Sequence, residues 1–263
     1  MSRMHFTKMH GLGNDFVLID CRSVAPDDLG ALAVRLCDRR RGVGADGLLV
    51  LQQSDVADCR MRIFNADGSE AAMCGNGIRC IACYARRHGI VSGTTALIET
   101  MSGLRDICFA ADGLVTVDMG VPRVASSDMT LDTACGGYKV ISVSTGNPHG
   151  VVFVDRVGRF DVSGIGPLLE CHPVWPDRAN IEFVEPVDRH MLRQRTWERG
   201  VGETDACGTG ACAAAAAAVA HGLASWPVIV DLNGGRLHID VSPSGHMLMT
   251  GPAVEVFDGA TDI

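Results

Sequence analysis

Short apolar or alternating runs, rich in β-branched residues, recur along the whole chain. Most are bounded by Gly, Asp or Asn, a pattern typical of strands that end in tight turns. In the first half this pattern predicts strands at 16–20, 47–52, 59–65, 96–100 and 114–120. In the second half it predicts strands at 140–144, 150–155, 180–185, 192–198, 227–232, 237–241 and 246–251.

Three longer segments have the pattern of helices. Residues 75–88 and 208–221 each follow a Cys-Gly turn and end at a histidine followed by glycine, which commonly terminates helices. The second segment is rich in alanine, whose high helix propensity and slim side chain suit the crowded centre of a sheet. A third helix is predicted within 25–44, with a Pro-Asp start and an arginine-rich last turn.

The chain repeats itself at a constant spacing. The stretches "MCGNGIRC" and "ACGTGACA" contain Cys74 and Cys207, and the separation of Asn14 from Asn147 equals that of the two cysteines. We call this separation the repeat offset. Self-similarity at a fixed offset indicates duplicated structural units. We therefore predict an α+β fold with two pseudo-symmetric domains, 1–125 and 126–263. Each is expected to be a curved, barrel-like, antiparallel-type sheet around a central helix.

Composition narrows the class of protein. The 263 residues are 47% hydrophobic and carry a net charge of −8, which fits a packed soluble core. No block of Lys and Arg marks a nucleic-acid partner. The start of the chain lacks a secretory apolar segment, and no run of about 18 apolar residues predicts a membrane span. Eleven scattered cysteines without an export signal indicate reduced thiols and a cytoplasmic location.

Cofactor chemistry is disfavoured by two observations. Only Lys8 and Lys139 could hold pyridoxal phosphate as a Schiff base, and neither lies in a glycine loop that could bind phosphate. A zinc site at Cys74, Cys80 and Cys83 is an alternative, but the last two fall inside a predicted helix and their spacing is not repeated after Cys207. We predict neither a metal nor a cofactor.

The two Cys-Gly-x-Gly turns suggest acid–base chemistry. A cysteine at a helix N-terminus lies beside unsatisfied N–H groups and the positive end of the helix dipole, and both favour the thiolate. The same N–H groups can bind a carboxylate. Two such turns could invert a carbon next to a carboxylate, with one thiolate removing a proton and the other thiol delivering one to the opposite face. A duplicated turn with a purely structural role is the alternative.

Several stretches together resemble the diaminopimelate epimerase family. They are "KMHGLGNDFVLID", "RGVGADGLL", "RIFNADGSEAAMCGNGIRC", "GNPHG", "RANIEF" and "TWERGVGETDACGTGACA", in order along nearly the whole chain. The resemblance implies a cofactor-independent isomerase of LL- and meso-diaminopimelate, acting in lysine and peptidoglycan precursor synthesis. It also implies a homodimer, and domains whose terminal strands can cross from one to the other.

The resemblance also assigns residues. It implies that Cys74 and Cys207 are the catalytic acid and base, with Glu198 and His149 near the reacting amino group. It implies substrate-binding roles for Asn14, Asn65, Gly75, Asn76, Asn147, Asn180, Arg199, Gly208 and Thr209. Asparagine offers a donor and an acceptor to a zwitterion, and arginine can bind a carboxylate with two parallel hydrogen bonds.

Two positions depart from the family pattern. Gly47 stands where some members have a glutamine that touches substrate, and Gly150 stands where many have a cysteine or an aliphatic residue. Both leave room for a change in substrate fit. The alternatives are therefore a related racemase that acts on a different amino acid, and a non-catalytic amino-acid-binding module. A binding module would be expected to lose one of the two cysteines.

Overall fold

A computed structural model describes residues 3–262, which form two compact units. The first unit contains the described residues up to Val117 together with those from Gly251 onward, and the second unit is Asp118–Thr250. The boundaries predicted from the repeat, 1–125 and 126–263, differ from these at both ends of the second unit. The pairing of the terminal strands, described below, accounts for the difference.

The helices and strands repeat in the same order in the two halves. In the first half they are β1 (Arg3–Gly11), β2 (Asn14–Asp20), α1 (Leu29–Cys37), β3 (Gly47–Gln52), β4 (Cys59–Asn65), β5 (Glu70–Ala71), α2 (Gly75–Arg87), β6 (Thr95–Thr100), β7 (Gly103–Phe109), β8 (Val115–Asp118) and β9 (Arg123–Val124). A short strand, β10 (Met129–Thr133), follows.

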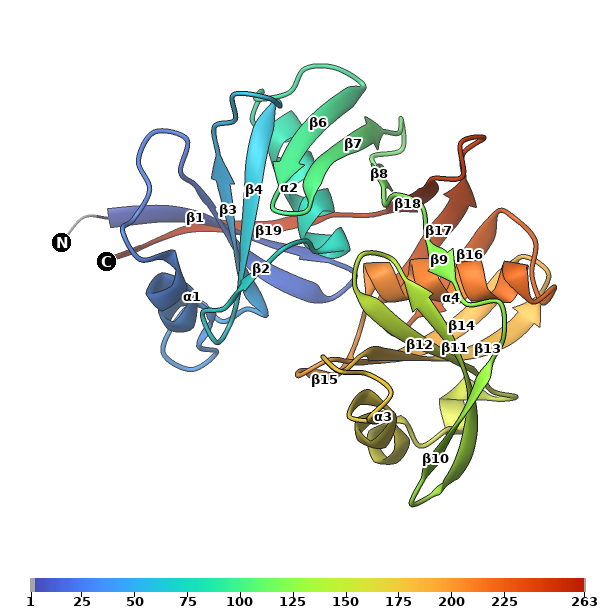
Figure 1. Cartoon of the computed structure of the whole chain (residues 1–263). Coiled ribbons are helices and arrows are strands. Elements are labelled where there is room, and N and C mark those ends of the chain that lie inside the picture. Colours follow the sequence, from blue (N-terminus) through green and yellow to red (C-terminus); the bar gives the residue numbers. More distant parts are fainter. Residues whose placement is uncertain (1–2, 263) are drawn as a thin grey trace. The chain divides into compact units, whose positions relative to one another are not determined.

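The second half contains β11 (Gly136–Ser144), β12 (Pro148–Phe153), the 3₁₀ turn η1 (Val157–Arg159), α3 (Val162–Glu170), β13 (Asn180–Asp188), β14 (Met191–Glu198), β15 (Gly202–Thr204), α4 (Gly208–Ala220), β16 (Val228–Leu232), β17 (Gly235–Val241), β18 (Met247–Gly251) and β19 (Val254–Asp262). Helices α3 and α4 begin one repeat offset after α1 and α2. The offset found in the sequence is therefore an offset between equivalent elements (Figure 1).

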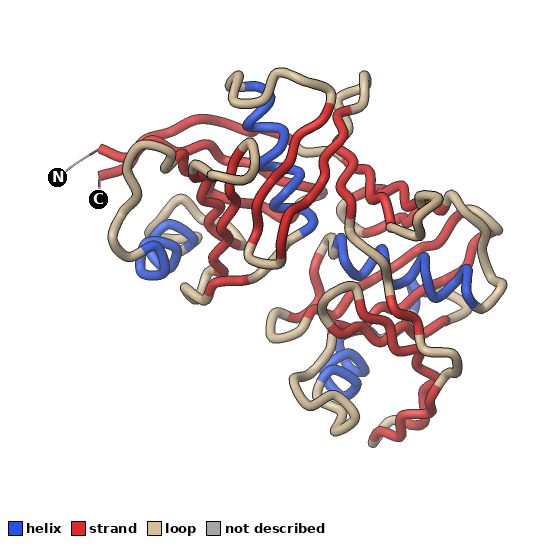
Figure 2. The backbone as a smooth tube through the Cα atoms, turned by 45° about the horizontal axis from the view of Figure 1, so that its top comes forward, coloured by secondary structure: helices blue, strands red, loops and turns tan. Residues whose placement is uncertain are grey.

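Strand pairing explains where the units divide. The first unit pairs its strands in the order β19, β1, β2, β3, β4, β6, β7, β8. The second pairs β9, β11, β12, β13, β14, β16, β17 in the same way, and β18 follows β17. The last strand of each repeat thus pairs with the first strand of the other repeat. Figures 1 and 2 show β1 and β19 side by side, and Arg3 of β1 pairs with Asp262 of β19.

The sheets are mixed and not only antiparallel as expected. Strand β2 pairs in parallel with β3 through the crossover helix α1, and β4 pairs in parallel with β6 through α2. In the second unit α3 connects the parallel pair β12 and β13, and α4 connects β14 and β16. A parallel pair requires a long crossover connection, and in this chain each crossover contains a helix.

Helices α2 and α4 lie among the strands of their own units. Helix α2 contacts β1, β2, β3, β4 and β19, and α4 contacts strands from β9 to β17. Ala211–Ala218 are all buried, so this part of α4 has no solvent-exposed face. Figure 2 shows this helix among strands. The expected central helix is therefore present in each unit.

The sequence pattern missed some elements. Helix α3 contains two glycines and Pro167, which hide its periodicity. Helix α1 is shorter than expected, because Asp28 caps its start and Arg39–Arg41 lie in the turn beyond its end. The terminal strands β1 and β19 have mixed composition; they pair with each other, and β1 also pairs with β2.

Candidate active site

The first Cys-Gly-x-Gly turn opens α2. Cys74 is the N-cap residue, with extended backbone, and its Sγ accepts a hydrogen bond from the N–H of Gly77 at 3.4 Å. A Cβ on Gly77 would lie 2.9 Å from Cδ2 of Leu49, so a larger residue would require the Leu49 side chain or the turn to shift. The second glycine therefore lets the helix start approach β3 closely.

Asn14 reaches this turn from a tight hairpin. Strands β1 and β2 are joined by Leu12 and Gly13, which both have positive φ angles, 58° and 87°. Two consecutive residues with positive φ form a type I′ turn, whose twist matches that of a β-hairpin. Leucine adopts a positive φ only with some backbone strain. The hairpin places Oδ1 of Asn14 3.9 Å from Sγ of Cys74 and 3.1 Å from Nδ2 of the buried Asn76.

The second turn opens α4 in the other unit. Cys207 is the N-cap residue and is only 4% exposed. Its Sγ lies 3.6 Å from Oγ1 of Thr209, which accepts a hydrogen bond from Nδ2 of Asn147 at 3.5 Å. A Cβ on Gly210 would lie 2.6 Å from Oε1 of Glu182, so a larger residue would displace this buried carboxyl group.

The environment of Cys207 opposes the thiolate. Burial, followed by the nearby carboxyl groups of Glu198 and Glu182, raises its pKa well above the usual value. A hydrogen bond from Thr209 acts in the other direction but is outweighed. The expectation that the helix N-terminus lowers the pKa is therefore wrong for Cys207, because desolvation exceeds the effect of the helix end.

Glu198 lies next to this thiol. Burial raises the pKa of its carboxyl, while hydrogen bonds from Thr204 and Cys207 partly counteract that effect. The Thr204 hydroxyl donates to Oε1 of Glu198 at 2.6 Å. A carboxyl whose pKa is raised and which contacts a thiol whose pKa is also raised is a candidate general acid–base partner.

A fully buried polar pair lies behind the second turn. Nδ1 of His149 is 2.8 Å from Oε1 of Glu182, and both side chains are 0% exposed. Nε2 of His149 is 3.0 Å from Oδ1 of Asn147, which also accepts a hydrogen bond from Thr145. The family motifs predicted His149 and Asn147 as site residues but not Glu182. Glu182 is the one completely buried acidic residue of β13, and it lies among apolar residues of that strand.

The remaining predicted residues lie at strand ends. Oδ1 of Asn180 accepts a hydrogen bond from the backbone N–H of Arg199 at 2.9 Å, and the exposed Arg199 guanidinium donates to the carbonyl of Asp177. Asn65 ends β4 opposite Gly47 and donates through Nδ2 to Ser69. The structure thus brings Asn180 and Arg199 together in the second unit and places Asn65 in the first.

Both departures from the family pattern are closely packed. A Cβ on Gly47 would lie 2.8 Å from the carbonyl oxygen of Phe64, and one on Gly150 would lie 3.0 Å from Val140. A glutamine at position 47 would therefore require the backbone to move. Gly75 and Gly208, the first residues of the two helices, are buried.

The other cysteines differ in exposure. Cys80 of α2 and Cys212 of α4 are buried, and Cys83 of α2 is half-buried. Cys108, Cys135 and Cys171 are exposed and do not belong to the core. Among residues 3–262, no helix has the length and apolar character needed to cross a membrane.

Solved structures of a hydroxyproline epimerase and of a PhzF-family protein have the same fold as this chain. A hydroxyproline epimerase from Agrobacterium vitis aligns with a TM-score of 0.78 over 98% of this chain and 92% of its own, at 17% identity. A phenazine biosynthesis protein of the PhzF family from Bacillus anthracis aligns with a TM-score of 0.79 over the whole of both chains, also at 17% identity. Similarity at this level shows the fold alone.

Sequence comparison identifies the family. The diaminopimelate epimerase family model matches residues 6–125 and 141–256. The diaminopimelate epimerase of Desulforudis audaxviator is 50% identical, and that of Pelotomaculum thermopropionicum 46%; each alignment covers 97% of this chain and 98% of the relative. The chain belongs to the diaminopimelate epimerase family.

Proposed function

We propose that this protein interconverts LL- and meso-diaminopimelate without a cofactor, by proton transfer at the α-carbon between two cysteines. The observation that carries the proposal is the equivalence of Cys74 and Cys207, which cap helices α2 and α4 at the same position of the two repeats. The names of relatives at 46–50% identity support the choice of substrate.

In this mechanism the two thiols act from opposite faces of one carbon. Cys207 removes the α-proton of the LL-isomer and Cys74 donates a proton to the other face, with the roles reversed in the opposite direction. Because burial and the nearby carboxyl groups raise the pKa of Cys207, the thiol form predominates in the free protein, and Cys207 must lose its proton before it can act as the base. Glu198 and His149 act near the reacting amino group, and the helix N-termini at Gly75, Asn76, Gly208 and Thr209 bind the reacting carboxylate.

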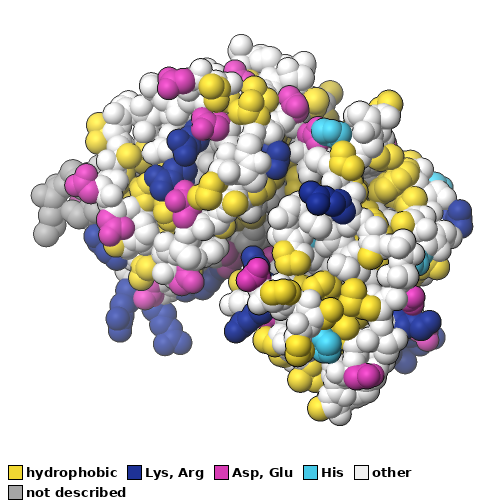
Figure 3. Space-filling view, in the orientation of Figure 1, with side chains coloured by type: hydrophobic (Ala, Val, Ile, Leu, Met, Phe, Trp, Pro, Cys, Tyr) yellow, Lys and Arg dark blue, Asp and Glu magenta, His cyan; other side chains and the backbone are white. Residues whose placement is uncertain are grey.

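The other end of the substrate needs its own contacts. We assign them to Asn65, Asn180 and Arg199, with Asn14 and Asn147 beside the two cysteine turns. The partner is thus a small amino acid, and neither a nucleic acid nor a membrane is proposed as a partner. Acidic and basic side chains are interspersed over the face in Figure 3, without the continuous basic stripe that nucleic-acid binding favours.

Exchange of the α-proton tests the function. The wild-type chain, with no added cofactor, is incubated with LL-diaminopimelate in deuterium oxide, and deuterium incorporation and the meso product are measured. We expect both to appear. Exchange with another amino acid but not with diaminopimelate would favour the related racemase, and the absence of exchange with any amino acid would favour the binding module.

We also propose a cytoplasmic homodimer, as the family resemblance implies. Val256 and Phe257 of β19 are 54% and 49% exposed, which offers apolar surface on the terminal strand pair. Light scattering on the intact chain should give twice the mass of one chain; the mass of a single chain at micromolar concentration would contradict the dimer.

A further inference from the structure

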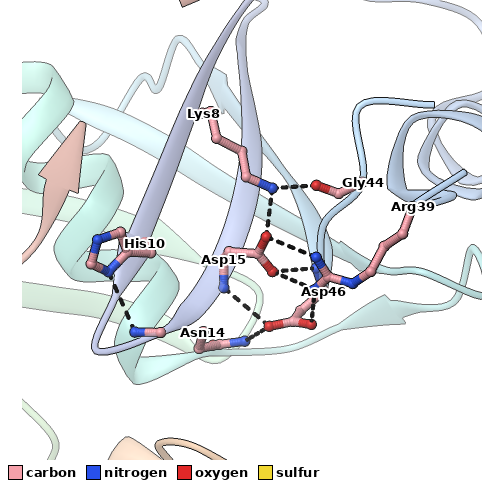
Figure 4. A network of polar contacts seen from close by, with 8 residues as sticks. Lys8, His10, Asn14, Asp15, Arg39, Gly44 and Asp46 are labelled. Atoms are coloured by element: carbon pink, nitrogen blue, oxygen red, sulfur yellow. Dashed lines mark hydrogen bonds and ion pairs between the residues drawn. The ribbon is translucent and has the colours of Figure 1, made fainter. Parts of the chain in front are cut away.

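The side-chain amide of Asn14 is held in one orientation from two sides. Its Nδ2 donates to Oδ2 of Asp46 at 2.9 Å, and a carboxylate offers only acceptors (Figure 4). Its Oδ1 accepts from Nδ2 of Asn76 at 3.1 Å. If the amide were reversed, its oxygen would face the carboxylate and its NH₂ would face another NH₂.

The orientation of Asn76 is fixed in turn by a buried cation. Arg79 is 0% exposed, and its guanidinium donates to Oδ1 of Asn76 at 3.0 Å and to the carbonyl of Gly75 at 3.1 Å. Guanidinium has no acceptor, so Asn76 must present its oxygen to Arg79 and its NH₂ to Asn14. The hydrogen bonds therefore run in one direction, from Arg79 through Asn76 and Asn14 to Asp46.

Asp46 is itself held in place on the α1–β3 connection. Its Oδ1 accepts from Arg39 at 2.7 Å, and its Oδ2 also accepts the backbone N–H of Asp15 at 3.0 Å (Figure 4). Arg39 also donates to Asp15, which in turn accepts from Lys8. Burial raises the pKa of Asp15, but the hydrogen bonds from Arg39 and Lys8 outweigh it and hold the pKa at about 2.

We infer that Asp46 is a positioning residue for Cys74. By fixing the amide of Asn14, it presents Oδ1 of Asn14 to the Cys74 sulfur, 3.9 Å away, as a hydrogen-bond acceptor. An acceptor at this position stabilises the protonated thiol relative to the thiolate. Cys74 is then poised as the proton donor. This inference rests on the proposed function for its consequence in catalysis, but not for its effect on the thiol.

The second repeat arranges the equivalent amide the other way round. Asn147 presents Oδ1 to His149 and Thr145, and its Nδ2 points to Thr209 beside Cys207. Ala179 occupies the position one repeat offset after Asp46, so no carboxylate is available there to anchor the NH₂ group. The two cysteine turns therefore meet opposite ends of their asparagine amides.

Alkylation of Cys74 in the intact protein tests the role of Asp46. Iodoacetamide is applied at pH 7, and mass spectrometry of the Cys74 peptide gives the rate. Asp46→Asn should raise this rate about three- to tenfold, because Asn14 is then fixed only by Asn76, and its NH₂ group can turn toward the sulfur for part of the time. The rate at Cys207 should stay unchanged. Asp112→Asn, which removes a carboxylate that caps the β7–β8 turn, is the matched control and should change neither rate.

A double-mutant cycle separates this role from a simple charge effect. The charged groups near the turn and its hydrogen-bond network are Arg79 of α2, Asp15 of β2, Lys8 of β1, Arg39 and Asp46 of the α1–β3 connection, and the Arg62–Glu70 pair of β4 and β5. If Asp46 acts through the amide, Asp46→Asn should have no further effect in an Asn14→Ala background. An equal acceleration in both backgrounds, or none in either, would overturn the inference.

A second measurement keeps the inference separate from the proposed function. Epimerisation of diaminopimelate by Asp46→Asn should fall mainly in kcat, with little change in KM, and circular dichroism should show that the variant is folded. If the wild type failed to epimerise diaminopimelate, the proposed function would fail, but the alkylation rates would still decide whether Asp46 positions Cys74.

Discussion

The two repeats have the same backbone plan but different interiors around their cysteine turns. Behind Cys207 the second unit buries His149, Glu182, Gln194 and Thr196. The positions one repeat offset earlier are Phe16, Leu49, Met61 and Ile63, all buried and apolar. The two repeats therefore share a backbone fold, but the buried residues near Cys207 are polar and partly acidic, whereas those at the equivalent positions near Cys74 are apolar.

Both repeats also have an ion pair next to the strand that leads into the cysteine turn. Arg62 pairs with Glu70 at 2.7 Å, and Arg195 pairs with Glu203 at 2.6 Å, again separated by the repeat offset. Each pair connects β4 or β14 to the short strand that leads into the cysteine turn. The two halves therefore differ mainly in the side chains close to the cysteine sulfur atoms.

The largest effect is expected when either thiol is removed. Cys74→Ser and Cys207→Ser should each lower net epimerisation by at least about a hundredfold, because each face of the α-carbon needs its own proton carrier. Chiral separation of the LL- and meso-isomers measures the loss. Cys212→Ser, a buried cysteine of α4 outside the turn, is the control, and full activity in either turn variant would contradict the two-base mechanism.

The buried polar pair gives the next effect. Glu182→Leu copies Leu49 of the first repeat and should cost about 3 kcal/mol in the free energy of unfolding, because it leaves His149 buried without its partner. Adding His149→Phe, which copies Phe16, should recover most of that stability but not the activity. Urea unfolding measures both; if the double variant remained as unstable as the single one, the two repeats would differ in more than this pair.

The acidic surrounding of Cys207 predicts a change in its reactivity. Glu198→Gln removes a negative charge that raises the pKa of this thiol, so its alkylation should become faster and begin at lower pH. Mass spectrometry of the Cys207 peptide across pH 7–10 measures the shift, with Cys74 as the internal comparison. A shift at Cys74 as large as that at Cys207 would mean that the substitution acts on the whole protein.

The smallest effect is expected from the network around Asp15 in the first unit. Its pKa lies below the ordinary value, so its contribution to stability is present above about pH 4 and is lost as the pH falls toward about 2. Asp15→Asn should therefore destabilise the protein by about 1 kcal/mol at pH 7, since solvent screening reduces the full linkage value. Urea unfolding at pH 7 and pH 3 should show the difference shrinking in acid; a constant difference would exclude linkage as its cause.

Much of the plan could be predicted from local sequence signals. The repeat offset, the helices that follow Cys74 and Cys207, and most central strands have patterns that depend on neighbouring residues alone. Helix α3 was hidden by Pro167 and two glycines, since packing against β14 supports it more than its own propensity does. The set of candidate residues came from the family motifs, which also lie within short segments.

The amino-acid sequence alone determined the duplication, the α+β class, the two capping cysteines and the family. Only the tertiary structure decided that β9 and β19 pair with the opposite repeat, that burial raises the pKa of Cys207, and that Asp46, Arg79 and Glu182 surround the turns. The physical reason is the distance along the chain between the residues that interact. Helix caps and turns depend on residues a few positions apart, whereas desolvation, amide orientation and strand exchange depend on groups that are distant in the chain and meet only after folding.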